Sequence, residues 1–79
     1  MPRPLKRSLT LNGHRTSVSL EDAFWTAFRA LAARRRLGIN ALAAEVDAAR
    51  DPGTGLATAL RLAVLSDLEA RLAAAAQAG

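Results

Sequence analysis

The stretch His14-Arg15-Thr16-Ser17-Val18-Ser19-Leu20 decides how this chain folds. Its side chains alternate, so that one face carries Thr16, Val18 and Leu20 and the other carries Arg15, Ser17 and Ser19, as in a half-buried strand. From Glu21 onward the period becomes helical, with Phe24, Phe28 and Leu31 on one face. A single strand followed by helices has unpaired edges, so we expect it to pair with the same strand of a second copy.

The chain has 79 residues and no cysteine, which limits how it can be stabilised. A domain of this size buries only about 60% of its unfolded surface, and neither a disulfide nor a Cys-based metal site can compensate. Oligomerisation is the remaining common device. The longest apolar run is too short to span a bilayer, and the N-terminus lacks the apolar core of a signal peptide. We therefore expect a soluble, cytoplasmic protein without membrane contacts.

The formal net charge of +4 is concentrated near the N-terminus. Before Glu21 the only charged residues are basic, namely Arg3, Lys6, Arg7 and Arg15, and from there on seven basic residues balance seven acidic ones. The excess positive charge therefore lies on the N-terminal arm and strand. There it either contacts a polyanion or is a solvated tail.

Residues 5–11 repeat the alternating pattern and are followed by Asn12-Gly13, the strongest two-residue signal for a tight hairpin turn. In such a hairpin the facing pairs include Leu11 with His14, Leu9 with Thr16 and Arg7 with Val18. One face is then mostly apolar, and the other carries Lys6, Ser8, Thr10, Arg15, Ser17 and Ser19. Residues 5–11 form either this outer strand, which we favour for the free protein, or a flexible basic arm.

Three helices are expected after the strand. Spacing and capping signals predict them over 21–36, 39–50 and 55–76, with Gly38 and Thr54 as N-caps of the second and third. The third carries apolar residues at helical spacing, namely Leu56, Leu60, Val64, Leu65, Leu68 and Leu72. The chain thus divides into a disordered tail (1–4), a core of strands and two helices (5–50), a Pro/Gly loop (51–55) and an additional helix (56–79).

Nothing in the sequence indicates an enzyme, a cofactor or a metal site. His14 is the only histidine and stands beside the turn, where cross-strand packing is its expected role. Glu45 and Asp47 are two residues apart on a helix and point to different faces, so they do not form a carboxylate pair. No Gly-rich phosphate loop follows a strand.

Features suited to nucleic-acid binding are better represented. A two-stranded antiparallel ribbon fits the major groove of B-DNA, which is about 12 Å wide, and its outward side chains can touch base edges. The N-terminus of the second helix, at Gly38, Ile39 and Asn40, offers free amide N–H groups to a phosphate. Lys6 and Arg7 are expected to add phosphate contacts through their charge.

Three features of the sequence form a combined pattern. They are the segment Arg15-Thr16-Ser17-Val18-Ser19-Leu20, an amphipathic helix containing Phe24-Trp25, and the turn Leu37-Gly38-Ile39-Asn40-Ala41-Leu42. Over residues 6–66 this pattern resembles the ribbon-helix-helix family of small bacterial DNA-binding proteins, which includes the Arc repressor, and within it a proteobacterial branch. The resemblance implies an α+β, mostly α-helical, intertwined homodimer. Its shared core would include Val18, Leu20, Phe24, Trp25, Phe28 and Leu42. By position, Arg15, Ser17 and Ser19 would read bases, and the start of helix two would hold phosphates.

The predicted hairpin sets this chain apart from the family pattern. Hairpins in both subunits would make a four-stranded sheet about 14 Å across, wider than the groove. Residues 5–11 are then a flexible arm, or an outer strand that peels away on binding, or the protein does not read DNA through its ribbon. Our interpretation is a transcriptional repressor that binds double-stranded DNA. The alternative is an antitoxin-like adaptor that holds a protein partner through residues 56–72 and binds DNA weakly or not at all.

Overall fold

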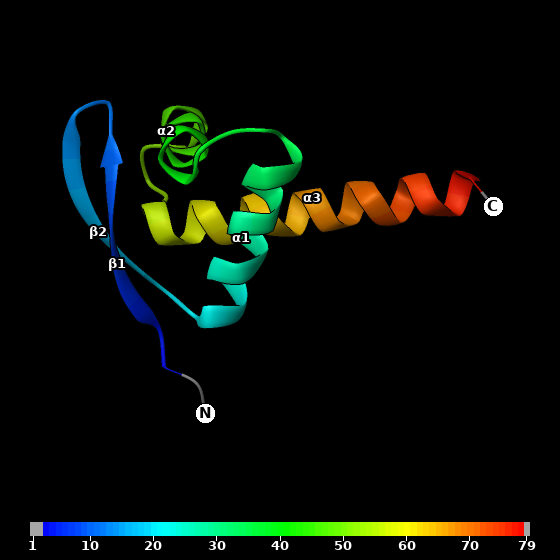
Figure 1. Ribbon diagram of the computed structural model, residues 1–79, viewed down its shortest axis with the longest axis horizontal. Coiled ribbons are helices and arrows are strands. Elements are labelled where there is room, and N and C mark those ends of the chain that lie inside the picture. The colour runs from blue at the N-terminus through cyan, green and yellow to red at the C-terminus, as the bar shows by residue number, and fades with distance from the viewer. Residues whose placement is uncertain (1–2, 79) are drawn as a thin grey trace.

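The computed structural model describes residues 3–78 and contains a β-hairpin followed by three helices. The elements are β1 (Leu5–Leu11), β2 (His14–Leu20), α1 (Asp22–Arg34), α2 (Ile39–Ala49) and α3 (Leu56–Ala78). Figure 1 shows the hairpin to one side of the helices and α3 extending away from it to the C-terminus. The α+β class, with a hairpin and three helices, is confirmed. Of the predicted tail, residues 1 and 2 lie outside the described residues, and Arg3 and Pro4 are exposed and belong to no helix or strand.

The turn at Asn12-Gly13 closes the hairpin in the predicted way. Both residues have positive φ angles, 52° for Asn12 and 86° for Gly13, as a two-residue turn that matches the strand twist requires. The antiparallel register pairs Leu11 with His14, Leu9 with Thr16 and Arg7 with Val18. Residues 5–11 therefore form an outer strand in this structure rather than a flexible arm.

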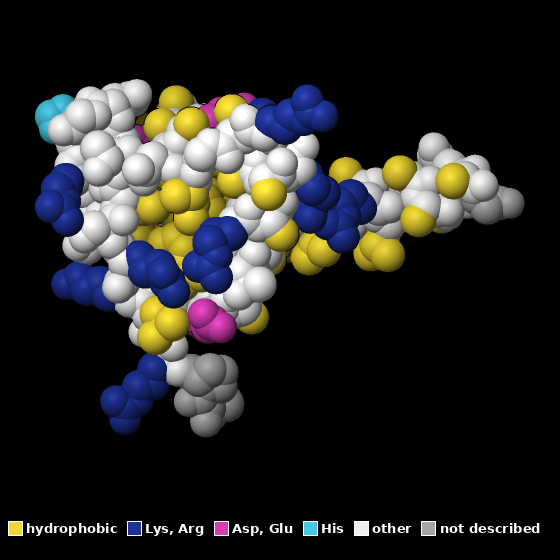
Figure 2. Space-filling model, in the orientation of Figure 1, with side chains coloured by type: hydrophobic (Ala, Val, Ile, Leu, Met, Phe, Trp, Pro, Cys, Tyr) yellow, Lys and Arg dark blue, Asp and Glu magenta, His cyan; other side chains and the backbone are white. Residues whose placement is uncertain are grey.

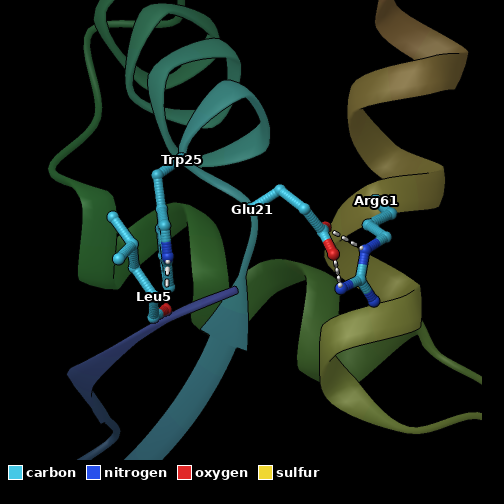
Figure 3. A network of polar contacts seen from close by, with 4 residues as sticks. All are labelled: Leu5, Glu21, Trp25 and Arg61. Atoms are coloured by element: carbon cyan, nitrogen blue, oxygen red, sulfur yellow. Dashed lines mark hydrogen bonds and ion pairs between the residues drawn. The ribbon is translucent and has the colours of Figure 1, made fainter. Parts of the chain in front are cut away.

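The inner face of the hairpin covers the helices. Leu9, Leu11, Val18 and Leu20 are buried there, in one cluster with residues of all three helices. The largest fully buried side chains of the cluster are Trp25, Phe28, Leu20, Leu42 and Leu60. The indole N–H of Trp25 donates to the carbonyl of Leu5 at 2.9 Å, which ties the start of β1 to α1 (Figure 3).

The residues expected to form a shared dimer core are mostly buried within one chain. Val18, Leu20, Trp25, Phe28 and Leu42 are at most 5% exposed, and Phe24 is partly buried, with the Arg61 guanidinium 5.7 Å from the centre of its ring. One chain thus provides a closed core by itself. The homodimer stays a prediction.

Two arginine ion pairs fix α1 to α3. Arg61 makes a two-pronged contact with Glu21 at the start of α1, at 2.9 and 3.2 Å, and Arg34 near its end pairs with Asp67 (Figure 3 shows the first). Hydrogen bonds from Arg61 hold the pKa of the Glu21 carboxyl below its ordinary value. The contribution of this ion pair to stability is therefore present at neutral pH and disappears as the pH falls through that lowered pKa.

The apolar residues of α3 fall into a buried and an exposed group, and the predicted N-cap of this helix was wrong. Leu60 and Val64 are buried, whereas Leu65, Leu68 and Leu72 are 50%, 42% and 71% exposed. The exposed leucines lie on a stripe turned by roughly a quarter of a turn from the buried one. The C-terminal part of α3 extends past the other helices (Figure 1). The helix also begins at Leu56 on the carbonyl of Gly55, which accepts from the Ala59 N–H at 3.0 Å, and not on Thr54. The Thr54 carbonyl instead accepts a hydrogen bond from Arg50 at 2.7 Å.

Replacing Trp25 by Phe should lower the free energy of unfolding by about 1–3 kcal/mol, because it removes the hydrogen bond to Leu5 and leaves a small cavity. Urea unfolding followed by far-UV circular dichroism measures this. Thr26→Ala, at an exposed position of the same helix, should change stability by less than about 0.5 kcal/mol. Unchanged stability of Trp25→Phe would contradict the role of this hydrogen bond.

Candidate nucleic-acid interface

The outer face of the hairpin is polar, basic and exposed. It carries Lys6, Ser8 and Thr10 from β1 opposite Ser19, Ser17 and Arg15 from β2, and all six are exposed. The hairpin contains no acidic residue. Because the helices cover the inner face, this outer face is the side of the sheet that a large partner can reach.

The two edges of the sheet differ. Backbone groups along an antiparallel strand point alternately toward its partner and away from it. Since Leu11 and His14 flank the turn as a bonded pair, the amides of Lys6, Ser8 and Thr10 point away from β2, and those of Arg15, Ser17 and Ser19 point away from β1. In the part of the chain that the structure describes, the β2 edge has no partner, whereas the Thr10 N–H donates to Oδ1 of Asn40 at 3.1 Å.

The end of α1 places the start of α2 beside β1. Leu37 N–H donates to the carbonyl of Ala32 at 2.9 Å and Arg36 N–H to that of Ala33 at 3.0 Å, with Arg36 at a left-handed φ of 57°. This is the Schellman arrangement that ends a helix. Gly38 then serves as the N-cap of α2, as predicted, with extended backbone angles. The amide groups of Gly38, Ile39 and Asn40 thus stand at the β1 edge of the sheet, where Asn40 contacts Thr10.

A shallow hollow lies between β1, α1 and the start of α2. Its apolar lining is Leu9, Trp25 and Ile39, and Arg7, Ser8 and Arg29 surround it. Figure 2 shows basic side chains beside an apolar hollow on this part of the molecule. The Arg7 guanidinium lies 5.8 Å from the centre of the Trp25 ring, within cation–π range.

Lys6 and Arg7 therefore occupy different places. Lys6 lies on the outer face, opposite Ser19, whereas Arg7 turns inward over Trp25 at the β1 edge. Arg29, which was not among the residues predicted from the sequence, joins Arg7 at the hollow. The spacing of Trp25 and Arg29, four residues apart on one helix face, was the available signal.

The positive charge without a carboxylate partner gathers near the hairpin. Within residues 3–78, the arginines in ion pairs are Arg34, Arg35, Arg50, Arg61 and Arg71. The basic residues outside these pairs are Arg3, Lys6, Arg7, Arg15, Arg29 and Arg36. Five of these six, all except Arg36, lie on the hairpin, just before it or at the hollow, so an anion meets a positive field there.

The geometry combines a two-stranded sheet with a polar outer face, a helix N-terminus beside it and a short connection between two helices. The family model for the ribbon-helix-helix domain matches residues 4–68. This chain belongs to the ribbon-helix-helix family. The chain matches no curated protein and no solved structure.

Ribbon-helix-helix domains are in general DNA-binding regulators of transcription that form dimers. In this member, no helix of the described residues is long and apolar enough to cross a membrane. No three His, Asp or Glu side chains among residues 3–78 lie where they could hold a metal ion together. The start of α2 and the two arginines at the hollow, Arg7 and Arg29, lie beside the hairpin of this ribbon-helix-helix chain.

Asn40→Ala should speed hydrogen exchange of the Thr10 amide, because it removes the acceptor that holds this N–H at the β1 edge. Asn40→Asp, which keeps an acceptor oxygen, should retain the protection. The Ser8 amide, on the same edge, should exchange quickly in all three proteins. NMR-detected exchange measures these rates, and an unchanged Thr10 rate in Asn40→Ala would contradict the hydrogen bond.

Proposed function

We propose that this protein is a sequence-specific DNA-binding protein that acts as a transcriptional repressor, as a homodimer in the cytoplasm of a bacterial cell, and contacts DNA with the outer face of its hairpin. The observation that carries the proposal is this face itself, where Lys6 and Arg15 stand among small hydroxyl side chains with no acid nearby in the hairpin. Most affinity for DNA comes from charge, and sequence is read by side chains that reach base edges.

Roles follow from where each side chain lies. Arg15 is the residue best suited to read a base, because a guanidinium can make two hydrogen bonds to guanine in the major groove. Ser17 and Ser19 are short and discriminate poorly, so their contacts would mainly set how closely the sheet approaches. Both of these serines are exposed on the same face as Arg15.

Phosphate contacts would come from the β1 edge. When the outer face enters the groove, the amides of Gly38, Ile39 and Asn40 would face the phosphates along one side of the groove. Arg7 and Arg29 lie at the neighbouring hollow. Lys6 can reach either a phosphate or a base from the outer face. We add Arg29 to the phosphate contacts expected from the sequence, because it lies beside Arg7 and has no ion-pair partner among the described residues.

A second candidate function rests on α3. Leu65, Leu68 and Leu72 are exposed on one side of α3, as the surface of an adaptor that holds a protein partner would be. A mobility-shift assay over a series of salt concentrations separates the two functions. A repressor retards duplex DNA with an affinity that falls steeply with salt, whereas an adaptor without DNA-binding activity does not retard it.

If Arg15 reads a base, Arg15→Ala should weaken binding to a preferred duplex by about 1–3 kcal/mol and relax the preference at one base pair. Fluorescence anisotropy on a duplex recovered by selection from random DNA measures the weakening. Arg71→Ala, which removes the same charge from α3, is the matched control and should have little effect. Equal weakening on preferred and random duplexes would make Arg15 a phosphate contact.

If Arg29 holds a phosphate, Arg29→Ala should weaken binding by a similar factor on all duplexes. It should also reduce the slope of log affinity against log salt concentration by about 1 for each phosphate that the protein no longer neutralises. Titrations at several salt concentrations give this slope. Arg71→Ala, which removes a basic side chain from α3, is the control and should leave the slope unchanged. A sequence-dependent weakening in Arg29→Ala would argue against a phosphate-binding role.

A further inference from the structure

The hollow between β1, α1 and the start of α2 has an apolar floor and a basic rim. Leu9, Trp25 and Ile39 form the floor, and the rim carries Arg7 and Arg29, with no acidic residue among the lining side chains. The volume of the hollow is about 410 Å³, within the range of about 300–1,000 Å³ that small-molecule sites occupy. Figure 2 shows dark blue side chains beside a recessed yellow surface there. The hollow therefore offers a small ligand both apolar contacts and positive charge.

The floor is preformed, because the core holds its side chains in place. Trp25 is fully buried, and its indole N–H donates to the Leu5 carbonyl at 2.9 Å. Leu9 is 3% exposed and belongs to the core cluster, against which Ile39 packs at the start of α2. A ligand does not have to order these side chains when it binds, so little of its contact free energy is lost in organising the site.

The two arginines of the rim suit a carboxylate. The guanidinium of Arg7 lies 5.8 Å from the centre of the Trp25 ring, and Arg29 follows Trp25 by one turn of α1 on the same helix face. Neither arginine is among those that form ion pairs within residues 3–78. A planar guanidinium makes two parallel hydrogen bonds to a carboxylate, and the methylene stems of both side chains extend the apolar surface around it.

Charge and floor together define the class of ligand. An inorganic anion would use the arginines but leave the apolar floor in water, and a neutral apolar molecule would leave the arginines unused. A carboxylate with a compact apolar body uses both parts of the hollow. The hollow also lies at the β1 side of the sheet, so pairing of two subunits through their β2 edges would leave it open.

We propose that this hollow is a binding site for a small amphipathic carboxylate, whose carboxylate group pairs with Arg7 and Arg29 and whose apolar body lies over Leu9 and Ile39. The site itself does not depend on DNA binding. Its consequence rests on the proposed function, which gives the same two arginines to DNA phosphates. A bound carboxylate neutralises their charge, so it acts as an effector that weakens binding to DNA.

Cyclohexanecarboxylate, titrated into the full chain by calorimetry at constant ionic strength, tests the site. We expect a dissociation constant of about 0.5–3 mM, as suits a ligand of this size. Cyclohexanecarboxamide, which has the same shape without the charge, and acetate, which has the charge without the apolar body, should each bind at least about tenfold more weakly. The indole N–H signal of Trp25, the only tryptophan, should shift with the carboxylate in NMR spectra and so locate it.

Arg29→Met keeps an apolar stem but removes the charge, so it should weaken binding of cyclohexanecarboxylate by at least about fivefold. Arg71→Met, on α3 and away from the hollow, is the matched control and should bind it as the unmodified protein does. The proposal is overturned if the carboxylate does not bind or if the amide binds equally well. Equal binding of inorganic phosphate or acetate, or equal weakening in both variants, would also overturn it, because either result shows only a general attraction of anions.

The effect on DNA is measured by fluorescence anisotropy with a duplex recovered by selection from random DNA. Cyclohexanecarboxylate at about ten times its dissociation constant should weaken duplex binding by at least about fivefold relative to the same concentration of sodium chloride. An unchanged affinity, with the carboxylate bound at the hollow, would overturn the effector role. If the unmodified protein retards no duplex even at low salt, the proposed DNA binding fails, and calorimetry alone then decides whether the carboxylate site exists.

Discussion

The pairing of β1 with β2 is the interaction on which the rest of this structure depends. It places Leu9 and Leu11 beside Val18 and Leu20, and these four side chains cover the helices from one side. Without β1, the buried indole of Trp25 would have no Leu5 carbonyl as its acceptor, and a buried donor without a partner costs about 1–3 kcal/mol. The hairpin therefore helps to close the core of a chain that has no disulfide.

The same pairing separates the chemistry of the two sheet faces. Because side chains alternate across a strand, the register that buries the leucines also turns Lys6 and Arg15 outward, at opposite ends of the sheet. The helices neutralise much of their own charge through ion pairs such as Arg34 with Asp67 and Arg61 with Glu21. The remaining positive charge stands near the hairpin and at the hollow beside α2, so the surface that can approach a groove is also the one that attracts phosphates.

Much of this arrangement could be predicted from the sequence, because local rules specify it. Asn12-Gly13 supports two positive φ angles, which fixes a two-residue turn and with it the register of every pair. The helix boundaries agree with the predictions to within two residues. Gly38 caps α2 as expected, since the extended backbone there suits an N-cap.

Features that depend on tertiary contacts were missed or mistaken. Periodicity placed Leu65, Leu68 and Leu72 on one side of α3, but it could not show which side of the helix faces the core. Arg29 joins Arg7 only because α1 packs beside β1, so its place at the hollow follows from the fold and not from its neighbours in the chain.

The central claim is that the outer face of the hairpin is the surface that meets DNA. Amide chemical shifts of ¹⁵N-labelled protein, recorded while a selected duplex is added, test it most directly. We expect the largest changes at Lys6, Ser8, Thr10, Arg15, Ser17, Ser19 and the start of α2, while residues 65–78 of α3 change little. Changes concentrated along α3, with the hairpin amides unaffected, would contradict the claim.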